Sequence, residues 1–267
     1  SGGASIGLKN TSKTASGKSW TMGNQLTFSG SGELDNGMNV SLSMVIDQND
    51  DSTKSTAAQL DNSPFDSHSV TVSSDSLGTL KFSGEGGSSA VSAMDGTAAG
   101  DIWDSFDIAS TVHPTGVGGG NNSMFYTLPS MVDGFAVTAS YNPSGSGTDS
   151  ATSVGVTYTG VEGLSVSYGM GDDTTVGNAG EGTALKASYA IGSVTVAYSN
   201  YEFDTTGTAS DDDTTSYKVS YTVSDDLSIT YGSETVERGT LVDGEYESIS
   251  ASYTAGGMTL SAAMKDA

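Results

Sequence analysis

The chain has 267 residues, no cysteine, and 9 Lys and Arg against 32 Asp and Glu, a formal net charge of −23. The missing thiols exclude disulfides and thiolate metal sites, and the acidic excess argues against a nucleic-acid partner, which requires clustered cations. No run of about 18 apolar residues is present to form a transmembrane helix. No apolar leader opens the chain, so we expect that any signal peptide has already been removed.

Apolar and polar residues alternate in short segments along the whole chain, which is typical of β-strands with one apolar face. No segment shows a sustained helical period, so the sequence predicts an all-β chain with about fifteen visible strands. In chain order they cover residues 6–8, 25–34, 38–47, 70–72, 80–82, 124–128, 135–141, 154–158, 164–170, 184–191, 194–200, 217–221, 227–231, 249–253 and 258–264.

The connections between these strands alternate in length. Short turns rich in Gly, Asn and Asp fall at 35–37, 76–78, 131–134, 160–163, 191–193, 224–226 and 255–257. Longer polar segments fall between them, at 11–19, 49–66, 86–121, 142–150, 171–181, 204–213 and 238–245. Strict alternation places all short turns at one end of the strands, as in outer-membrane barrels with short periplasmic turns and long outer loops.

The number of strands bears on whether the sheet closes into a barrel. Bacterial single-chain barrels have an even number of strands, and the fifteenth predicted strand runs almost to Ala267. We therefore expect one domain over residues 1–267, a closed antiparallel transmembrane barrel of about sixteen strands whose last strand lies beyond the sequence given. A count that is wrong by one is the alternative.

Four tyrosines recur at a similar offset before short turns, on the apolar face: Tyr158, Tyr189, Tyr221 and Tyr253. A ring of Tyr at one height is typical of the aromatic girdle at a membrane interface, where the hydroxyl stays hydrated. The high strand propensity of Tyr is the simpler explanation. The fixed offset from the turn favours the girdle.

Three stretches resemble the trimeric general porins of Gram-negative outer membranes, particularly the alphaproteobacterial type: LTFSGSGELDNGMNVSLSM (26–44), SLGTLKFSGEGG (76–87) and NNSMFYTLPSMVDGFAVTASYNP (121–143). The resemblance implies a homotrimeric, water-filled channel in the cell outer membrane, in contact with membrane lipid and lipopolysaccharide. It implies passage of ions and small polar solutes, and no cofactor.

The segment 86–121 is the longest connection, with 36 residues. In porins the third loop folds into the barrel and narrows the pore, so the resemblance implies an inward-folding constriction loop here. A short helical turn would place Ile102 and Phe106 against the wall and leave Asp101 and Asp104 in the lumen. The proline-glutamate-phenylalanine-glycine tip of enterobacterial porins is missing, so the geometry of the tip is not carried over.

The charged residues expected at the constriction lie on this loop and on the polar strand face, which also carries Glu234. They are Glu85, Asp95, Asp101, Asp104, Asp107, Lys9, Lys81, Lys186 and Lys218. Selectivity would come from pore width and from these charges. Because acids outnumber bases, we predict a preference for cations that weakens as salt screens the field.

No enzyme and no metal site are expected. The chain has two histidines, His68 and His113, and neither has a Ser or Asp at the spacing of a catalytic motif. The acidic runs 47–51 and 211–213 lack the spacing of a Ca²⁺ loop. The alternative function is an acidic surface-layer or adhesin protein built from soluble β-sandwiches, which explains the composition but not the alternation of turns and loops.

Overall fold

A computed structural model describes residues 1–11, 17–47, 65–94, 96–106, 117–143, 149–174, 179–205, 211–239 and 243–267. At 4–11, 17–24, 47, 65 and 238 it describes the backbone alone. Within this part of the chain, no helix is long and apolar enough to span a membrane.

Fifteen strands account for nearly all the regular structure of the described residues. They are β1 (Gly2–Thr11), β2 (Gly17–Glu33), β3 (Asn39–Asp47), β4 (Phe65–Ser74), β5 (Gly78–Glu85), β6 (Ser123–Thr127), β7 (Phe135–Pro143), β8 (Ser150–Tyr158), β9 (Leu164–Asp173), β10 (Gly180–Ile191), β11 (Val194–Thr205), β12 (Asp211–Ser224), β13 (Leu227–Arg238), β14 (Gly244–Ala255) and β15 (Met258–Asp266). A short 3₁₀ helix, η2 (Ile102–Ser105), lies between β5 and β6.

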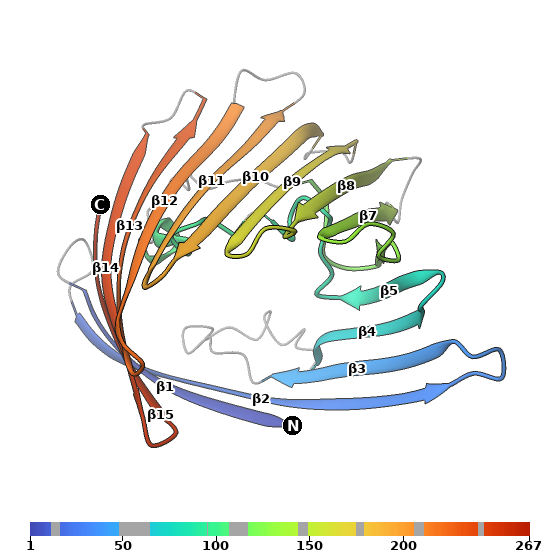
Figure 1. Ribbon diagram of the computed structural model, residues 1–267, viewed down its shortest axis with the longest axis horizontal. Helices are drawn as coiled ribbons and strands as arrows, with labels where there is room; N and C mark the ends of the chain where they lie inside the picture. Colours follow the sequence, from blue (N-terminus) through green and yellow to red (C-terminus); the bar gives the residue numbers. More distant parts are fainter. Residues whose placement is uncertain are drawn as a thin grey trace, which may run out of the picture.

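The strands form a single sheet in which each pairs antiparallel with its neighbours in sequence, in the order β1 to β15. Figure 1 shows this sheet curling round on itself. The predicted all-β barrel with fifteen visible strands is therefore confirmed. Among the described residues β1 and β15 do not pair with each other, and both run in the same direction. The expectation of a sixteenth strand stays a prediction.

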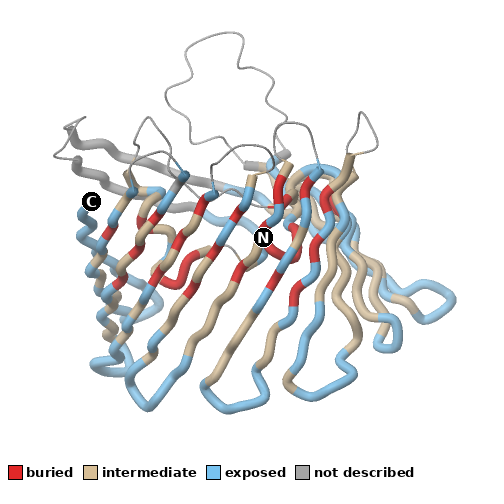
Figure 2. The backbone as a smooth tube through the Cα atoms, turned by 90° about the horizontal axis from the view of Figure 1, so that it is seen from above, coloured by how far each residue is buried: buried red, intermediate tan, exposed pale blue. Residues whose placement is uncertain are grey.

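Short turns close the hairpins at one end of the strands (Figure 2). Gly163 shows why these turns contain glycine. Its φ of 77° is in the left-handed region, and a Cβ there would lie 2.6 Å from the carbonyl oxygen of Ala190. Short and long connections alternate between the strands, as the sequence predicts. The short ones can be tight because their Gly, Asn and Asp residues tolerate positive φ.

The two faces of the sheet differ in chemistry. The outer, convex face exposes large apolar side chains from nearly every strand, including Phe28 (52%), Met170 (52%), Val219 (46%) and Ile249 (52%). The inner face carries mainly Ser, Thr and Gly, and its buried residues lie where the connection between β5 and β6 packs on it. A single sheet with an exposed apolar face rules out the soluble sandwich, which would bury that face between two sheets.

Candidate pore constriction

The connection between β5 and β6, here called the β5–β6 segment, is described over residues 86–94, 96–106 and 117–122. Its two ends are joined by backbone hydrogen bonds between Gly87 and Gly120, of 2.9 and 2.7 Å. Figure 1 shows the segment on the concave side of the sheet, along β8 to β13.

Glycines on the inner face make room for the segment. A Cβ on Gly169 would lie 3.2 Å from the Met94 sulfur, and one on Gly171 would lie 2.9 Å from Val117 Cγ1. On β13, a Cβ on Gly232 would lie 2.7 Å from Ala99 Cβ. Strand glycines commonly mark close approach of another backbone, which is their role here.

The segment buries its apolar side chains in two clusters on this wall. Val91 and Val117 pack with residues from three strands, Ala151, Ala184, Tyr201 and Phe203. Around η2, Ile102 packs with Val236 and Tyr246, and the Phe106 and Tyr246 ring centroids are 5.5 Å apart. Ile102 is 1% exposed. The apolar residues of the segment therefore act as anchors.

Serine and acidic side chains on the wall accept hydrogen bonds from the backbone of the segment. Ser199, Ser216 and Glu234 are cross-strand partners on β11, β12 and β13, in one row that also contains Lys186 on β10. The N–H of Ala98 donates to Ser199 Oγ at 2.8 Å. On the next two strands, the Ala99 N–H donates to Ser216 Oγ at 2.9 Å and the Trp103 N–H donates to Glu234 Oε2 at 3.1 Å.

The first and last parts of the segment have similar anchors on the neighbouring strands. The Ala90 N–H donates to Ser153 Oγ at 2.8 Å, and the Gly118 N–H donates to Asp173 Oδ2 at 3.3 Å. These bonds satisfy backbone groups that would otherwise be buried without a partner, at a cost of about 1–3 kcal/mol each. Each described part of the segment is thus anchored on the wall.

Two of the predicted constriction residues lie at η2, Asp101 at its start and Asp104 within it, and Lys186 lies near Asp101. Asp101 is half-buried and Asp104 is exposed. Asp101 Oδ2 and Lys186 Nζ each lie 3.8 Å from the point that a Cβ on Gly96 would occupy. The structure therefore brings Asp101 and Lys186 to the same side of the segment.

The other predicted residues are more scattered. Lys218 pairs across the ladder with Gly232, the glycine beneath Ala99. Lys81 lies near the turn-side start of β5 and Glu85 at its other end, opposite His68. Asp95 and Asp107 lie outside the described residues, and Lys9 is described only as a backbone position in β1, opposite Ser19.

Three polar contacts of the segment were not predicted from the sequence. The hydroxyl of Thr97 donates to Glu234, the amine of Lys265 donates to Ser105, and Asn142 Nδ2 donates to the Gly119 carbonyl at 2.9 Å. The alternation of strand residues assigns Glu234 and Asn142 to the inner face. Their partners depend on the path of the segment.

The four predicted girdle tyrosines lie on the outer face near the short-turn edge. Tyr189, Tyr221 and Tyr253 are exposed, and Tyr158 is half-buried against Phe135, with ring centroids 4.6 Å apart. Their position suits a membrane interface. The girdle role stays a prediction.

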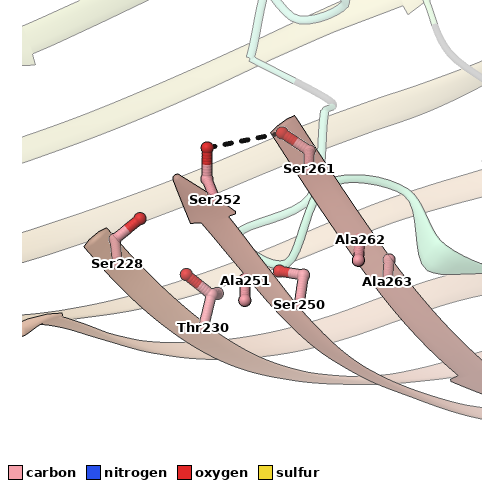
Figure 3. Close-up of a pocket in the computed structure, with 8 residues that line it drawn as sticks. All are labelled: Ser228, Thr230, Ser250, Ala251, Ser252, Ser261, Ala262 and Ala263. Atoms are coloured by element: carbon pink, nitrogen blue, oxygen red, sulfur yellow. Dashed lines mark hydrogen bonds between the residues drawn. The ribbon is translucent and has the colours of Figure 1, made fainter. Parts of the chain in front are cut away.

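A hollow of about 220 Å³ lies on β13, β14 and β15, away from the constriction (Figure 3). Serine and threonine hydroxyls line it, and Ser252 and Ser261 share a hydrogen bond of 3.3 Å. It is smaller than ordinary ligand pockets of about 300–1,000 Å³. Over the described residues, no group of three or more His, Asp or Glu is placed to hold a metal ion.

A curved antiparallel sheet with an exposed apolar outer face, a hydroxyl-rich inner face and a segment anchored inside defines the class of transmembrane β-barrel channels. The sequence profile of the Gram-negative porin family matches residues 1–264. The chain belongs to this family of outer-membrane channel proteins. None of the curated proteins matches the chain.

Solved porin structures share the fold. A porin refined at 1.8 Å resolution is 18% identical, with a TM-score of 0.65 over 99% of this chain and 92% of the other. A multiple-substitution variant of the Rhodopseudomonas blastica porin is 14% identical, with a TM-score of 0.71 over 99% and 92% of the chains. A loop-deletion mutant of OmpT, an outer membrane protein of Vibrio cholerae, is 17% identical, with a TM-score of 0.63 over 99% and 93%.

Proposed function

We propose that the chain is a general diffusion channel that passes ions and small hydrophilic solutes, prefers cations and catalyses no reaction. The observation that carries this proposal is the β5–β6 segment, which is anchored on the inner wall with Asp101 and Asp104 on it. A fixed segment inside the barrel narrows the water-filled passage. Charges at a narrow passage select by sign, since the low-dielectric wall strengthens their field.

The charge balance supports cation preference. Near the segment, Asp101 and Asp104 lie with two cations, Lys186 and Lys265, so the expected preference rests on the acidic excess of the chain, whose net charge is −23. The Debye length is about 10 Å at 0.1 M salt and about 3 Å at 1 M, so the preference decreases as salt rises.

The setting that we propose is a homotrimer in the outer membrane. Gly30 and Gly32 lie on the outer face of β2 with no atom within 4 Å of an added Cβ, which suits close protein contact. At the loop-side edge of the outer face, exposed carboxylates such as Glu202, Glu237 and Glu245 would face lipopolysaccharide headgroups bridged by divalent cations.

Recording from the purified protein in planar bilayers tests the function. We expect discrete conductance steps, with closures in multiples that match a trimer. Under a KCl gradient, the reversal potential is expected to show cation preference that decreases with salt. Anion preference would contradict the proposal that Asp101 and Asp104 select cations. The absence of any conductance steps would contradict the proposal that the protein forms a channel.

A further inference from the structure

Glu234 is a carboxylate on the inner wall that is hidden from the lumen. It lies on β13, is 1% exposed, and belongs to the row of cross-strand partners that contains Lys186, Ser199 and Ser216. Three groups of the segment donate to it, the hydroxyl of Thr97 and the backbone N–H groups of Ile102 and Trp103. A carboxylate so covered cannot contact ions in the lumen directly.

Thr97 connects this hidden carboxylate to Asp101. The Thr97 hydroxyl donates a hydrogen bond to Glu234, which leaves the lone pairs of the hydroxyl oxygen free to accept. That oxygen accepts the N–H of Gly100 at 3.1 Å and the N–H of Asp101 at 2.6 Å. In return, the N–H of Thr97 donates to Asp101 Oδ1 at 2.9 Å.

This network sets both the backbone and the side chain of Asp101. Its backbone is in the left-handed region, with φ 53° and ψ 56°. Such a conformation costs a non-glycine residue of order 1–3 kcal/mol and persists only where its surroundings enforce it. The hydrogen bonds to Thr97 enforce this backbone conformation. They leave Asp101 Oδ2 on the side of Gly96 where Lys186 Nζ also lies.

We propose that Glu234 is a positioning residue for ion selectivity: through Thr97 it holds the carboxylate of Asp101 at the constriction. This inference rests on the proposed function and deepens it. The other anchors of the row do not reach Asp101, since Ser199 and Ser216 bind the N–H groups of Ala98 and Ala99. Ser216→Ala is therefore a matched control, because it removes an anchor outside the network.

The test measures the cation-to-anion permeability ratio in planar bilayers under a KCl gradient for five variants. Asp101→Asn gives the ratio without the charge. Thr97→Val removes the hydroxyl, and Glu234→Gln replaces one acceptor oxygen with a donor. We expect both variants to lower the permeability ratio by roughly twofold or more, toward the ratio of Asp101→Asn. Thr97→Ser restores the hydroxyl and should restore the ratio. Ser216→Ala should keep the wild-type ratio.

Heat-modifiable mobility on gels shows which variants fold. If Glu234→Gln does not fold, the comparison of Thr97→Val with Thr97→Ser still tests the positioning role. A wild-type ratio in Thr97→Val, with a lowered ratio in Asp101→Asn, overturns the positioning role and leaves the channel intact. An equal loss in Ser216→Ala also overturns it, because any loosened anchor would then suffice. Wild-type protein that opens no channels overturns the proposed function and this inference with it.

Discussion

Single residues on the inner wall determine where the β5–β6 segment can lie. Gly232 leaves space for Ala99 and Ile102, whose Cβ and Cδ1 atoms lie 2.7 and 3.3 Å from the position of an added Cβ. Alternation assigns Gly232 and Glu234 to the inner face from the sequence alone. It does not show that both are covered, because Thr97 and Glu234 are 137 residues apart and meet only in the folded chain.

Gly232→Val is expected to push η2 off the wall and change the single-channel conductance. Overpacking of this kind costs about 1–3 kcal/mol, and the segment can relieve it by moving into the lumen. Gly3→Val is the matched control, since the nearest atom to an added Cβ there is Gln25 Cγ at 3.9 Å, an ordinary contact. Equal conductance in both variants would show that the segment does not pack on β13.

At the scale of elements, the strands and the segment differ in how far the sequence predicts them. Strands follow from a period of two and from turn glycines, which are local signals. The 3₁₀ turn at 102–105 falls where Ile102 and Phe106 suggested a short helical turn. The row of serine acceptors could not be predicted, because it depends on cross-strand register and on the path of the segment.

Loss of the main apolar anchor should loosen the segment and spare the barrel. Ile102→Ala removes a side chain that is 1% exposed, and such truncations cost about 2–5 kcal/mol. The hydrogen bonds between strands do not depend on it. We expect new protease cleavage within 96–106 while the rest of the barrel resists.

Asp104→Ala serves as the comparison, because Asp104 is exposed on the same helical turn. It should leave the cleavage pattern unchanged. Resistance of Ile102→Ala to cleavage would mean that the hydrogen bonds alone hold the segment.

At the scale of the whole molecule, the outer face has to lie against lipid. It exposes apolar side chains around the sheet, and adjacent residues of one strand face opposite environments. Val219 is 46% exposed on the outer face of β12, and Ser220 next to it bonds Thr230 on the inner face at 2.9 Å.

Val219→Arg should therefore destabilise the barrel in lipid by about 2–4 kcal/mol, since a cation on the lipid face of a barrel is costly near the bilayer centre. Ser220→Arg, which faces the water-filled side, should cost much less. Urea titration of folding into vesicles measures both. Similar costs for the two variants would mean that the outer face does not contact lipid.

The central claim is that the β5–β6 segment lines the channel, with Asp104 in the lumen and Ile102 against the wall. Because the chain has no cysteine, single cysteines report on this directly. The measurement is bilayer current through Asp104→Cys and Ile102→Cys channels while a charged thiol reagent is added. We predict that the current through Asp104→Cys changes within the recording and that the current through Ile102→Cys does not. An unchanged current through Asp104→Cys, with the thiol shown to be modified, would contradict the account.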